Sequence, residues 1–384
     1  MYKQVISSEK IPIKMWLQDI EDEALNQARN LANLPFVFHH IALMPDSHSG
    51  YGMPIGGVMA TKNVVVPNAV GVDIGCGMMA FKTKYKVDDI TVDDLKKFMG
   101  KIRSEIPVGF NHHHQKKNES FMPVITGDIP ISKSCFNDAR TYIGTLGGGN
   151  HFIEIQKGAD GNVWVMIHSG SRNLGKQVAD HYNDIAIELN TRWFSSVDKS
   201  KQLAFLPMET EEGQMYFNEM KYCVDFSYAN RDMMKNVICE IMETEAFDVI
   251  NIAHNYASME HHFGHNVLVH RKGATRAKDG ELGIIPGSQG SKSYIVKGLG
   301  NVESFCSCSH GAGRKMSRTK AQNELNLETE IKNMEDQGII HGIRTKKDLD
   351  ESAGAYKDIN VVMKNQEDLV DIYIELKPMA IIKG

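Results

Sequence analysis

Gly71-Val72-Asp73-Ile74-Gly75-Cys76-Gly77-Met78 is the stretch of this sequence that does most to decide the fold. Its glycines let the backbone turn tightly. Residues 78–85, which follow directly, are apolar or β-branched and bounded by turn residues, as strands are. The segment therefore predicts a tight glycine turn that leads into a β-strand.

Segments of the same kind recur along the chain. They are short, apolar or β-branched, and lie at residues 36–45, 63–67, 163–168, 266–270, 294–296 and 369–376. Each predicts a strand, because turn residues flank it on both sides. The strands do not show a βαβ rhythm with a G-x-G-x-x-G fingerprint, so a dinucleotide-binding fold has little support.

Helical segments alternate with these strands. Residues 92–106 and 179–194 carry apolar residues at helical spacing, and a longer helix is expected from about residue 211 to residue 247. Between about 180 and 248 the sequence is rich in methionine and poor in glycine. We therefore expect an α/β (α+β) fold, with this stretch as a helical excursion from one body.

The composition restricts the class of protein. With 384 residues, of which 42% are hydrophobic, the chain can bury a core as one large domain or two ordinary ones. The first 30 residues lack the apolar core of an export signal, and no later run approaches the roughly 18 apolar residues of a membrane helix. Six sparse cysteines do not form a disulfide framework, which favours a cytoplasmic location.

One group of residues has the chemistry of a metal site. Asp73 and Cys76 stand three residues apart in the glycine turn, so a carboxylate and a thiolate can converge there. His151 follows three glycines, His168 ends an apolar strand, and His254 stands between apolar and polar residues. Each alone is more often structural than a ligand, but together they suit a divalent ion. Ligand type alone does not choose the ion, since intrinsic affinity favours Zn²⁺ or Cu²⁺ over Mn²⁺.

The second group is Cys306-Ser307-Cys308-Ser309-His310-Gly311-Ala312-Gly313-Arg314. One alternative is a zinc knuckle, although the cysteine separation is unlike that of structural zinc sites and no second Cys/His cluster lies nearby. The other is phosphate chemistry. Glycines let backbone amides approach a ligand, and Arg314 and Arg318 offer fork-shaped donors on one face if a helix begins here. His310 would then attack a phosphorus atom beside the metal.

Seven motifs then occur in a fixed order along the chain. They are Met44-Pro45-Asp46-Ser47-His48-Ser49-Gly50-Tyr51-Gly52, Gly71-Val72-Asp73-Ile74-Gly75-Cys76-Gly77-Met78, Gly147-Gly148-Gly149-Asn150-His151-Phe152-Ile153-Glu154, His168-Ser169-Gly170-Ser171-Arg172, His254-Asn255-Tyr256, His270-Arg271-Lys272-Gly273-Ala274 and Ser309-His310-Gly311-Ala312-Gly313-Arg314. In these motifs the chain resembles the RtcB family of RNA-splicing and repair ligases, over residues 44 to 384.

The resemblance implies a fold and an activity. It implies one catalytic domain over residues 1–384, a large mixed-sheet body with the helical excursion at about 180–248. It also implies a ligase that joins an RNA 3′-phosphate or 2′,3′-cyclic phosphate to a 5′-hydroxyl, using GTP and two Mn²⁺ ions. His310 matches the family's guanylylated histidine. The implied manganese ligands are Asp73, Cys76, His151, His168 and His254, with Cys76 bridging both ions.

The resemblance also implies the nucleotide contacts. They are Asn150, His151, Phe152, Ile153, Glu154, His254, Asn255, Pro286, Gly287, Ser288, Gln289, Ser293, His310, Gly311, Ala312, Gly313, Tyr356 and Lys383. Glu154 can accept hydrogen bonds from guanine N1 and N2, and the Tyr356 ring can stack on the base. Lys383 reaches the site only if the tail folds back, as the preceding apolar run suggests.

RNA contacts need a local basic track, because the formal net charge of −5 gives no bulk attraction to nucleic acid. Arg172, Arg314 and Arg318 are the expected phosphate contacts, since they adjoin the metal and His310 motifs. Two rivals remain: a metal-dependent phosphodiesterase that needs no His310, and a non-catalytic binding relative. The physiological RNA, the oligomeric state and the need for an archease-like activator stay open, and Gln289 departs from the methionine expected in many members.

Overall fold

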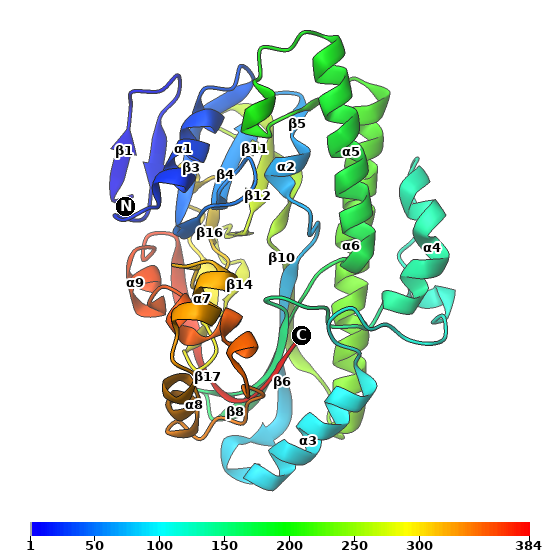
Figure 1. Ribbon diagram of the computed structural model, residues 1–384, viewed down its shortest axis with the longest axis vertical. Coiled ribbons are helices and arrows are strands. Elements are labelled where there is room, and N and C mark those ends of the chain that lie inside the picture. The colour runs from blue at the N-terminus through cyan, green and yellow to red at the C-terminus, as the bar shows by residue number, and fades with distance from the viewer. Residues whose placement is uncertain (1) are drawn as a thin grey trace.

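The computed structural model describes residues 2–384, which form two large β-sheets flanked by helices (Figure 1). The first sheet has six strands, in the order β1 (Gln4–Ile6), β2 (Ile13–Met15), β3 (Val37–His48), β4 (Ile55–Thr61), β12 (His265–Lys272) and β11 (Asn255–His262). Strands β2 and β3 pair in parallel, and the other neighbours are antiparallel. Antiparallel pairing of strands far apart in sequence makes this a non-local fold.

The second sheet has seven strands, all of them antiparallel to their neighbours. Their order is β10 (Phe247–Ala253), β6 (Gly77–Lys86), β8 (Asn162–Ser169), β7 (Phe152–Gly158), β17 (Val370–Lys383), β15 (Ser293–Gly298) and β14 (Leu282–Ile285). The last strand therefore lies inside the sheet, and Lys383 pairs with Phe152. Two short ribbons complete the strands: β13 (Ala274–Arg276) pairs with β16 (Ser307–Ser309), and β5 (Val64–Val65) with β9 (Leu206–Pro207).

Helices cover both sides of the sheets. They are α1 (Asp22–Ala32), α2 (Pro67–Val70), α3 (Val92–Glu105), α4 (Pro130–Tyr142), α5 (Arg172–Arg192), α6 (Glu211–Ile241), α7 (Arg318–Glu324), α8 (Leu327–Glu335) and α9 (Ile359–Lys364). Figure 1 shows α5 and α6 side by side along one flank, with α7, α8 and α9 on the opposite flank. No helix within residues 2–384 is long and apolar enough to cross a membrane.

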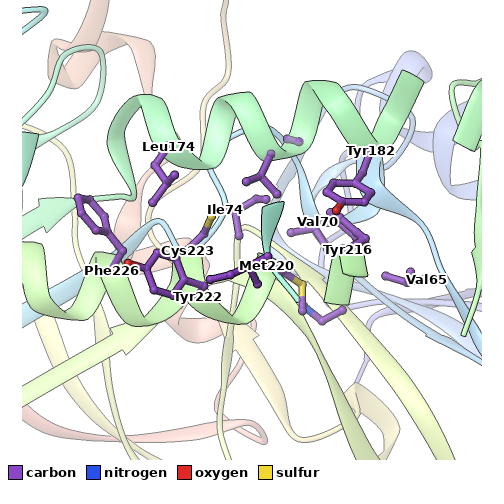
Figure 2. Packing of buried hydrophobic residues seen from close by; sticks show 14 of the residues in the cluster. Val65, Val70, Ile74, Leu174, Tyr182, Tyr216, Met220, Tyr222, Cys223 and Phe226 are labelled. Atoms are coloured by element: carbon purple, nitrogen blue, oxygen red, sulfur yellow. The ribbon is translucent and has the colours of Figure 1, made fainter. Parts of the chain in front are cut away.

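The largest apolar cluster lies between α5, α6 and the turn after α2 (Figure 2). Tyr182 of α5 packs on Tyr216 of α6, with ring centroids 5.4 Å apart. Phe226 and Met220 are also buried there, at 0% and 1% exposure. Burial of such side chains, at about 1.5–3 kcal/mol each, holds the long helices against the sheets. The methionine-rich stretch thus serves packing.

Helix α6 also supports the glycine turn before β6. Gly75 has φ of 74°, in the left-handed region, and a Cβ there would lie 2.4 Å from Ser227 Oγ. Arg231, fully buried on α6, donates to the carbonyl oxygens of Gly75 at 3.3 Å and Ser169 at 2.8 Å. The turn requires glycine for both conformation and space, and α6 fixes its position.

The predicted α/β fold class is confirmed. The predicted strands and helices differ from the structure mainly at their ends, but several elements, among them β4, β7, β11 and α4, were not predicted. Helix α6 stops at Ile241, and β10 begins at Phe247, where the sequence had suggested helix. Of residues 63–67 only two form a strand, because Pro67 begins a helical turn. No strand was predicted at His261 and His262, but both residues lie on β11, where they pair with β12.

Candidate active site

The turn between α2 and β6 carries the first two candidate ligands, Asp73 and Cys76. The amide of Cys76 donates to the carbonyl of Asp73 at 3.1 Å, which closes the turn. Cys76 is buried, at 3% exposure. Burial raises the pKa of the Cys76 thiol, and the Asp73 carboxylate raises it further. A cation bound between these two side chains would offset the cost of holding both as anions.

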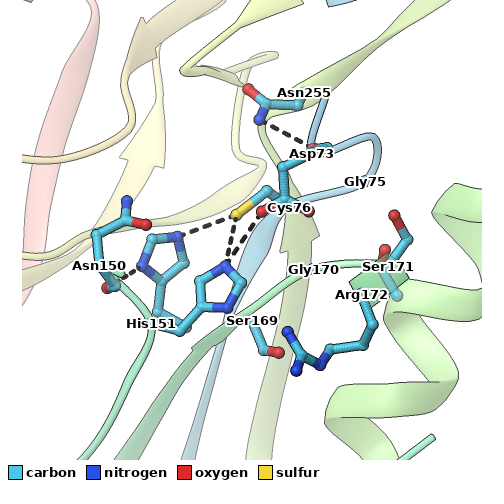
Figure 3. Close-up of polar contacts among 12 residues, drawn as sticks. Asp73, Gly75, Cys76, Asn150, His151, Ser169, Gly170, Ser171, Arg172 and Asn255 are labelled. Carbon is cyan, nitrogen blue, oxygen red and sulfur yellow. Dashed lines mark hydrogen bonds and ion pairs between the residues drawn. The ribbon is translucent and has the colours of Figure 1, made fainter. Parts of the chain in front are cut away.

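Strands β7 and β8 bring two histidines to this turn (Figure 3). His151 immediately precedes β7, and His168 lies on β8. Their Nε2 atoms lie 3.5 Å and 3.3 Å from Cys76 Sγ, respectively. His151 Nε2 also lies 3.1 Å from Asp73 Oδ2. The four side chains therefore converge on one point from two different parts of the sequence.

Backbone carbonyls orient both imidazoles. His151 Nδ1 lies 3.0 Å from the Leu146 oxygen, and His168 Nδ1 lies 3.0 Å from the Asn150 oxygen. A carbonyl can only accept, so each Nδ1 carries the proton and each Nε2 presents a lone pair towards Cys76. Burial lowers the pKa of His168 and of His254 well below the usual value, so these rings stay neutral, as metal ligands must.

Two groups among residues 2–384 have the compactness of a metal site. One is Cys76, His168 and His254, and the other is Asp73, Cys76 and His151; within each, the ligand atoms lie within 4.8 Å of one another. Cys76 belongs to both. His254 Nδ1 is buried and has no hydrogen-bond partner within residues 2–384, as expected of a nitrogen that coordinates a metal ion. The two groups together offer the carboxylate, thiolate and imidazole donors of a divalent metal site.

Asn255 ties the ligand loops together. Its Nδ2 donates to the Asp73 carbonyl at 3.0 Å, and its Oδ1 accepts from the Gly273 amide at 2.7 Å. Its own carbonyl accepts from Gly75 at 2.8 Å. Asn255 therefore fixes the spacing between the ligand turn, β11 and the β12–β13 connection.

His310 follows β16 and lies beside the metal-ligand candidates. Its ring centroid is 4.8 Å from that of His254. The Asp46 Oδ2 atom lies 2.6 Å from His310 Nδ1 and also accepts from the amides of His310 and Gly311 at 3.1 Å and 3.3 Å. Although burial opposes its ionisation, the contact with His310 lowers the pKa of the Asp46 carboxyl. The anion accepts a hydrogen bond from Nδ1, which leaves the lone pair of the ring on Nε2.

A cavity of about 660 Å³ opens in front of His310. Its volume lies within the 300–1,000 Å³ range of small-molecule sites. Most of the nucleotide contacts expected from the sequence line it, namely Asn150, His151, Phe152, Glu154, Pro286, Gly287, Ser288, Gln289, His310, Gly311, Ala312, Gly313, Tyr356 and Lys383. The cavity therefore joins segments from residue 150 to residue 383.

Four of the expected contacts do not line this cavity. Ile153 is fully buried in the core cluster under β7, and His254 lies behind His310. Asn255 instead holds the ligand turn and the β12–β13 connection together by its side-chain hydrogen bonds. Ser293 accepts from the Gly287 amide at 3.1 Å, so it shapes the 286–289 loop from beneath.

Glu154 is a buried carboxyl group on the cavity wall, at 4% exposure. Burial raises its pKa to about 8, in spite of the hydrogen bond from Gln156 at 2.6 Å. Most Glu154 side chains are therefore neutral at pH 7. A ligand with hydrogen-bond donors would favour the carboxylate instead.

The three arginines expected at RNA have different surroundings. Arg314 and Arg318 line the cavity, and both pair with Glu351, at 2.7 Å and 2.6 Å. Helix α7 begins only at Arg318, so the two arginines do not share a helix face as the sequence had suggested; Glu351 brings them together instead. Arg172 is outside the cavity lining and donates to the Gly109 carbonyl at 2.8 Å.

The chain end and the two cysteines before His310 also have clear positions. Strand β17 carries Lys383 to the cavity, where it forms an ion pair with Asp350.

Cys308 is fully buried and Cys306 partly buried. Within residues 2–384 neither cysteine belongs to a group compact enough for an ion, so the zinc-knuckle alternative has no support.

Sequence reasoning missed two acidic residues of the site. Asp46 lies in the first of the seven motifs, but its contact with His310 was not predicted, because the two residues are 264 positions apart in the sequence. Glu351 received no attention, although it accepts from Arg314, Arg318 and the Tyr356 hydroxyl. The only signal for Asp46 was a carboxylate inside an apolar strand, which needs a partner when buried.

The sequence of this chain matches known proteins over nearly its whole length. The family model described as "tRNA-splicing ligase RtcB" matches residues 27–128 and 126–384. The chain is 38% identical to the RNA-splicing ligase RtcB of Escherichia coli K12 over 416 residues, which cover all of both chains. It is 31% identical to the tRNA-splicing ligase RtcB of Thermococcus kodakarensis, with 95% of this chain and 92% of the relative covered.

A third relative is the tRNA-splicing ligase RtcB of Nanoarchaeum equitans, 30% identical over 461 residues, with 97% of this chain and 95% of the relative covered. These matches extend over nearly the whole chain and include every segment that contributes to the site. The resemblance found in the sequence motifs is thus confirmed, and the chain belongs to the RtcB family of RNA-splicing ligases.

Proposed function

We propose that this enzyme joins RNA 3′-phosphate or 2′,3′-cyclic phosphate ends to 5′-hydroxyl ends, with GTP and two Mn²⁺ ions, through a guanylylated His310. The observation that carries the proposal is the pairing of His310 with buried Asp46 on the wall of a nucleotide-sized cavity, beside the shared-thiolate donor set. A histidine so supported is a nucleophile towards phosphorus.

The first step is attack of His310 Nε2 on the α-phosphorus of GTP. A nitrogen–phosphorus bond forms, the bond from the α-phosphorus to the bridging oxygen breaks, and pyrophosphate leaves. Asp46 keeps the Nδ1 proton and balances the positive charge that develops on the ring. Gly313 lines the same cavity and carries no side chain, so its backbone can approach the nucleotide phosphates, while the amide of Gly311 donates to Asp46.

The second and third steps transfer GMP and then release it. An oxygen of the RNA 3′-phosphate attacks the GMP phosphorus, and the bond to His310 breaks. The RNA 5′-hydroxyl then attacks the activated RNA phosphorus, so that a phosphodiester forms and GMP leaves. A cyclic phosphate end is first opened by hydrolysis to a 3′-phosphate. We propose Arg172, Arg314 and Arg318 as the contacts to RNA phosphates.

Asp73, Cys76, His151, His168 and His254 would hold the two ions, since their donor atoms form the two compact groups. Bound there, Mn²⁺ would stabilise negative charge on the reacting phosphates. The protein's own contribution is to hold Nε2 of His151 and His168 towards one thiolate by means of backbone carbonyls.

The guanine base has proposed partners at the other end of the cavity. Glu154 would accept from the guanine N1 and N2 donors, which adenine lacks in that arrangement. Tyr356 offers its ring to the base, and its hydroxyl is already bound to Glu351. Lys383 reaches the same cavity through β17. The six free cysteines fit our further proposal that the reaction takes place in the cytoplasm.

An RNA joining assay tests the proposal against its rival. Wild-type protein with Mn²⁺ and GTP should join a 2′,3′-cyclic phosphate oligonucleotide to a 5′-hydroxyl oligonucleotide, and His310→Ala should lose joining by more than about 10³-fold. Elemental analysis should find the same metal content in both proteins. A phosphodiesterase would open the cyclic phosphate without joining, and His310→Ala would leave that activity unchanged; this result would exclude the ligase mechanism.

A further inference from the structure

A second cavity, of about 350 Å³, adjoins the active site beside α5. We call it the side pocket; its lining includes Tyr51, Asn68, Val72, Asn183 and Ile187. Tyr51 also lines the active-site cavity, so the two cavities meet at this ring. Val72 directly precedes the candidate ligand Asp73 in the chain. Whatever occupies the side pocket therefore lies next to the metal-ligand turn.

The lining of the side pocket suits a nucleobase. Tyr51 is 70% exposed, an unusual position for a large aromatic side chain, and Val72 and Ile187 add apolar surface at 50% and 38% exposure. Asn183 Oδ1 is buried and has no hydrogen-bond partner in residues 2–384. A flat ring can stack on Tyr51, and the Asn183 side chain, which lines the same pocket, offers a polar amide group for a hydrogen bond to the base.

The charges of the side pocket argue against a phosphate group as its occupant. Lys199 is its one basic lining residue and Asp180 its one acidic residue. Asp180 forms an ion pair with Lys176 on the same helix. A phosphate site in this protein would need several cations, as the arginine pair at Glu351 supplies in the active site.

The walls of the side pocket are fixed before any ligand arrives. Lys272 Nζ donates to the carbonyl oxygens of Tyr51 at 2.6 Å and Asn68 at 2.9 Å. Asn68 in turn donates to the Gln202 carbonyl at 2.9 Å. Lys272 thus joins the Tyr51 loop to α2, and Asn68 joins α2 to the loop that follows α5. A preformed pocket loses less conformational entropy when it binds a ligand.

We infer that the side pocket binds one unpaired nucleobase of the RNA substrate, namely the base of the terminal nucleotide at one of the two ends that are joined. This inference rests on the proposed function for the identity of the ligand. RNA ends can splay their bases onto aromatic side chains, whereas bases within a duplex are already stacked. The enzyme should therefore prefer single-stranded ends to ends that are base-paired to the last nucleotide.

The test uses RNA that carries 2-aminopurine, a fluorescent base that is quenched when it stacks. One oligonucleotide has the label in its last nucleotide, before a 3′-phosphate; the other has it in its first nucleotide, after a 5′-hydroxyl. Each is titrated with the whole protein and Mn²⁺ without GTP, so that no joining occurs. We expect quenching with at least one of the two, and the responding oligonucleotide identifies the strand.

Substitutions in the lining test whether the quenched base lies in the side pocket. Tyr51→Ala should weaken binding of the responding RNA roughly 5- to 150-fold, the range expected for loss of one stacked base. Tyr51→Phe should restore quenching, and Asn183→Leu should weaken binding roughly 5- to 150-fold, as expected for loss of one buried hydrogen bond. Tyr373→Ala is the matched control, because Tyr373 is 53% exposed and lines none of these cavities. It should bind RNA as the wild type does.

No quenching with either oligonucleotide, or unchanged affinity in both Tyr51→Ala and Asn183→Leu, would overturn the inference. Formation of a protein–GMP adduct, which uses no RNA, is measured on the same Asn183→Leu sample and should equal that of wild type. Absence of the adduct in the wild type would overturn the proposed mechanism, while loss of RNA quenching in the variants would still support the side pocket.

Discussion

At the residue scale, the Asp46–His310 pair is the contact on which the proposed chemistry depends. Asp46 is fully buried, yet it is held as an anion by the His310 ring and two amides. Asp46→Asn keeps the size of the side chain and removes the charge that supports the attacking ring. We expect the rate of protein–GMP formation to fall about 10²- to 10⁴-fold, with unchanged metal content. Adduct formation at the wild-type rate would show that Asp46 has no such role.

Glu154 should make GTP binding depend on pH. Its pKa is raised to about 8 by burial, so at pH 7 most molecules carry a neutral carboxyl group. In the proposed contact guanine donates to the carboxylate, so binding would release a proton, and affinity should rise roughly tenfold between pH 7 and pH 9.

Calorimetry on His310→Ala, which does not consume GTP, measures this affinity in two buffers of different ionisation enthalpy. The control Glu154→Gln should bind more weakly and show a flat pH profile. An equally steep profile in Glu154→Gln would assign the proton to another group.

At the element scale, the buried Arg271–Glu260 ion pair holds β16, the strand before His310, against the six-stranded sheet. Arg271 on β12 pairs with Glu260 on β11, and also donates to Ser307 Oγ on β16 and to the Phe305 carbonyl, both at 2.9 Å. The pair therefore joins the edge of the six-stranded sheet to the β13–β16 ribbon. Loss of Glu260 would leave Arg271 buried without a counter-charge.

Glu260→Gln should lower the free energy of unfolding at pH 7 by about 3–5 kcal/mol. Although burial opposes ionisation, Arg271 holds the pKa of Glu260 below its ordinary value of 4.5, so this stabilisation is present above pH 4.5 and is lost as the pH falls below it. Urea unfolding should therefore show a smaller difference at pH 3.5 than at pH 7.

Glu281→Gln is the matched control, since its partner Arg276 is 39% exposed and such a pair contributes less than about 1 kcal/mol. A difference between wild type and Glu260→Gln that grows as the pH falls would contradict this account of the pair.

The sequence predicted the candidate ligands better than the contacts that position them. Asp73, Cys76 and the histidines stand beside glycines or at strand ends, and such local features can be recognised without a structure. Glu351 and the side pocket depend on how α7, β17 and α5 meet distant loops. The strand at His261 was missed for the same reason, because its partner is defined by the sheet.

At the scale of the whole molecule, the α5–α6 core supports the active site from behind. Phe226 is fully buried in it, one residue before Ser227, which packs against Gly75 of the ligand turn. Phe226→Ala should lower the free energy of unfolding by about 3–5 kcal/mol, measured by urea denaturation. Tyr373→Ala, at an exposed position where the ring contacts the Lys297 ammonium, should change it by about 1 kcal/mol or less. Equal effects of the two changes would contradict the packing described here.

The central claim is that His310 becomes covalently guanylylated, and intact-protein mass spectrometry tests it most directly. After incubation with GTP and Mn²⁺, the wild-type protein should gain the mass of one GMP, and acid should remove it, as expected for a phosphorus–nitrogen bond. His310→Ala should gain nothing under the same conditions. An unmodified wild type, or an adduct of equal yield in His310→Ala, would contradict the account.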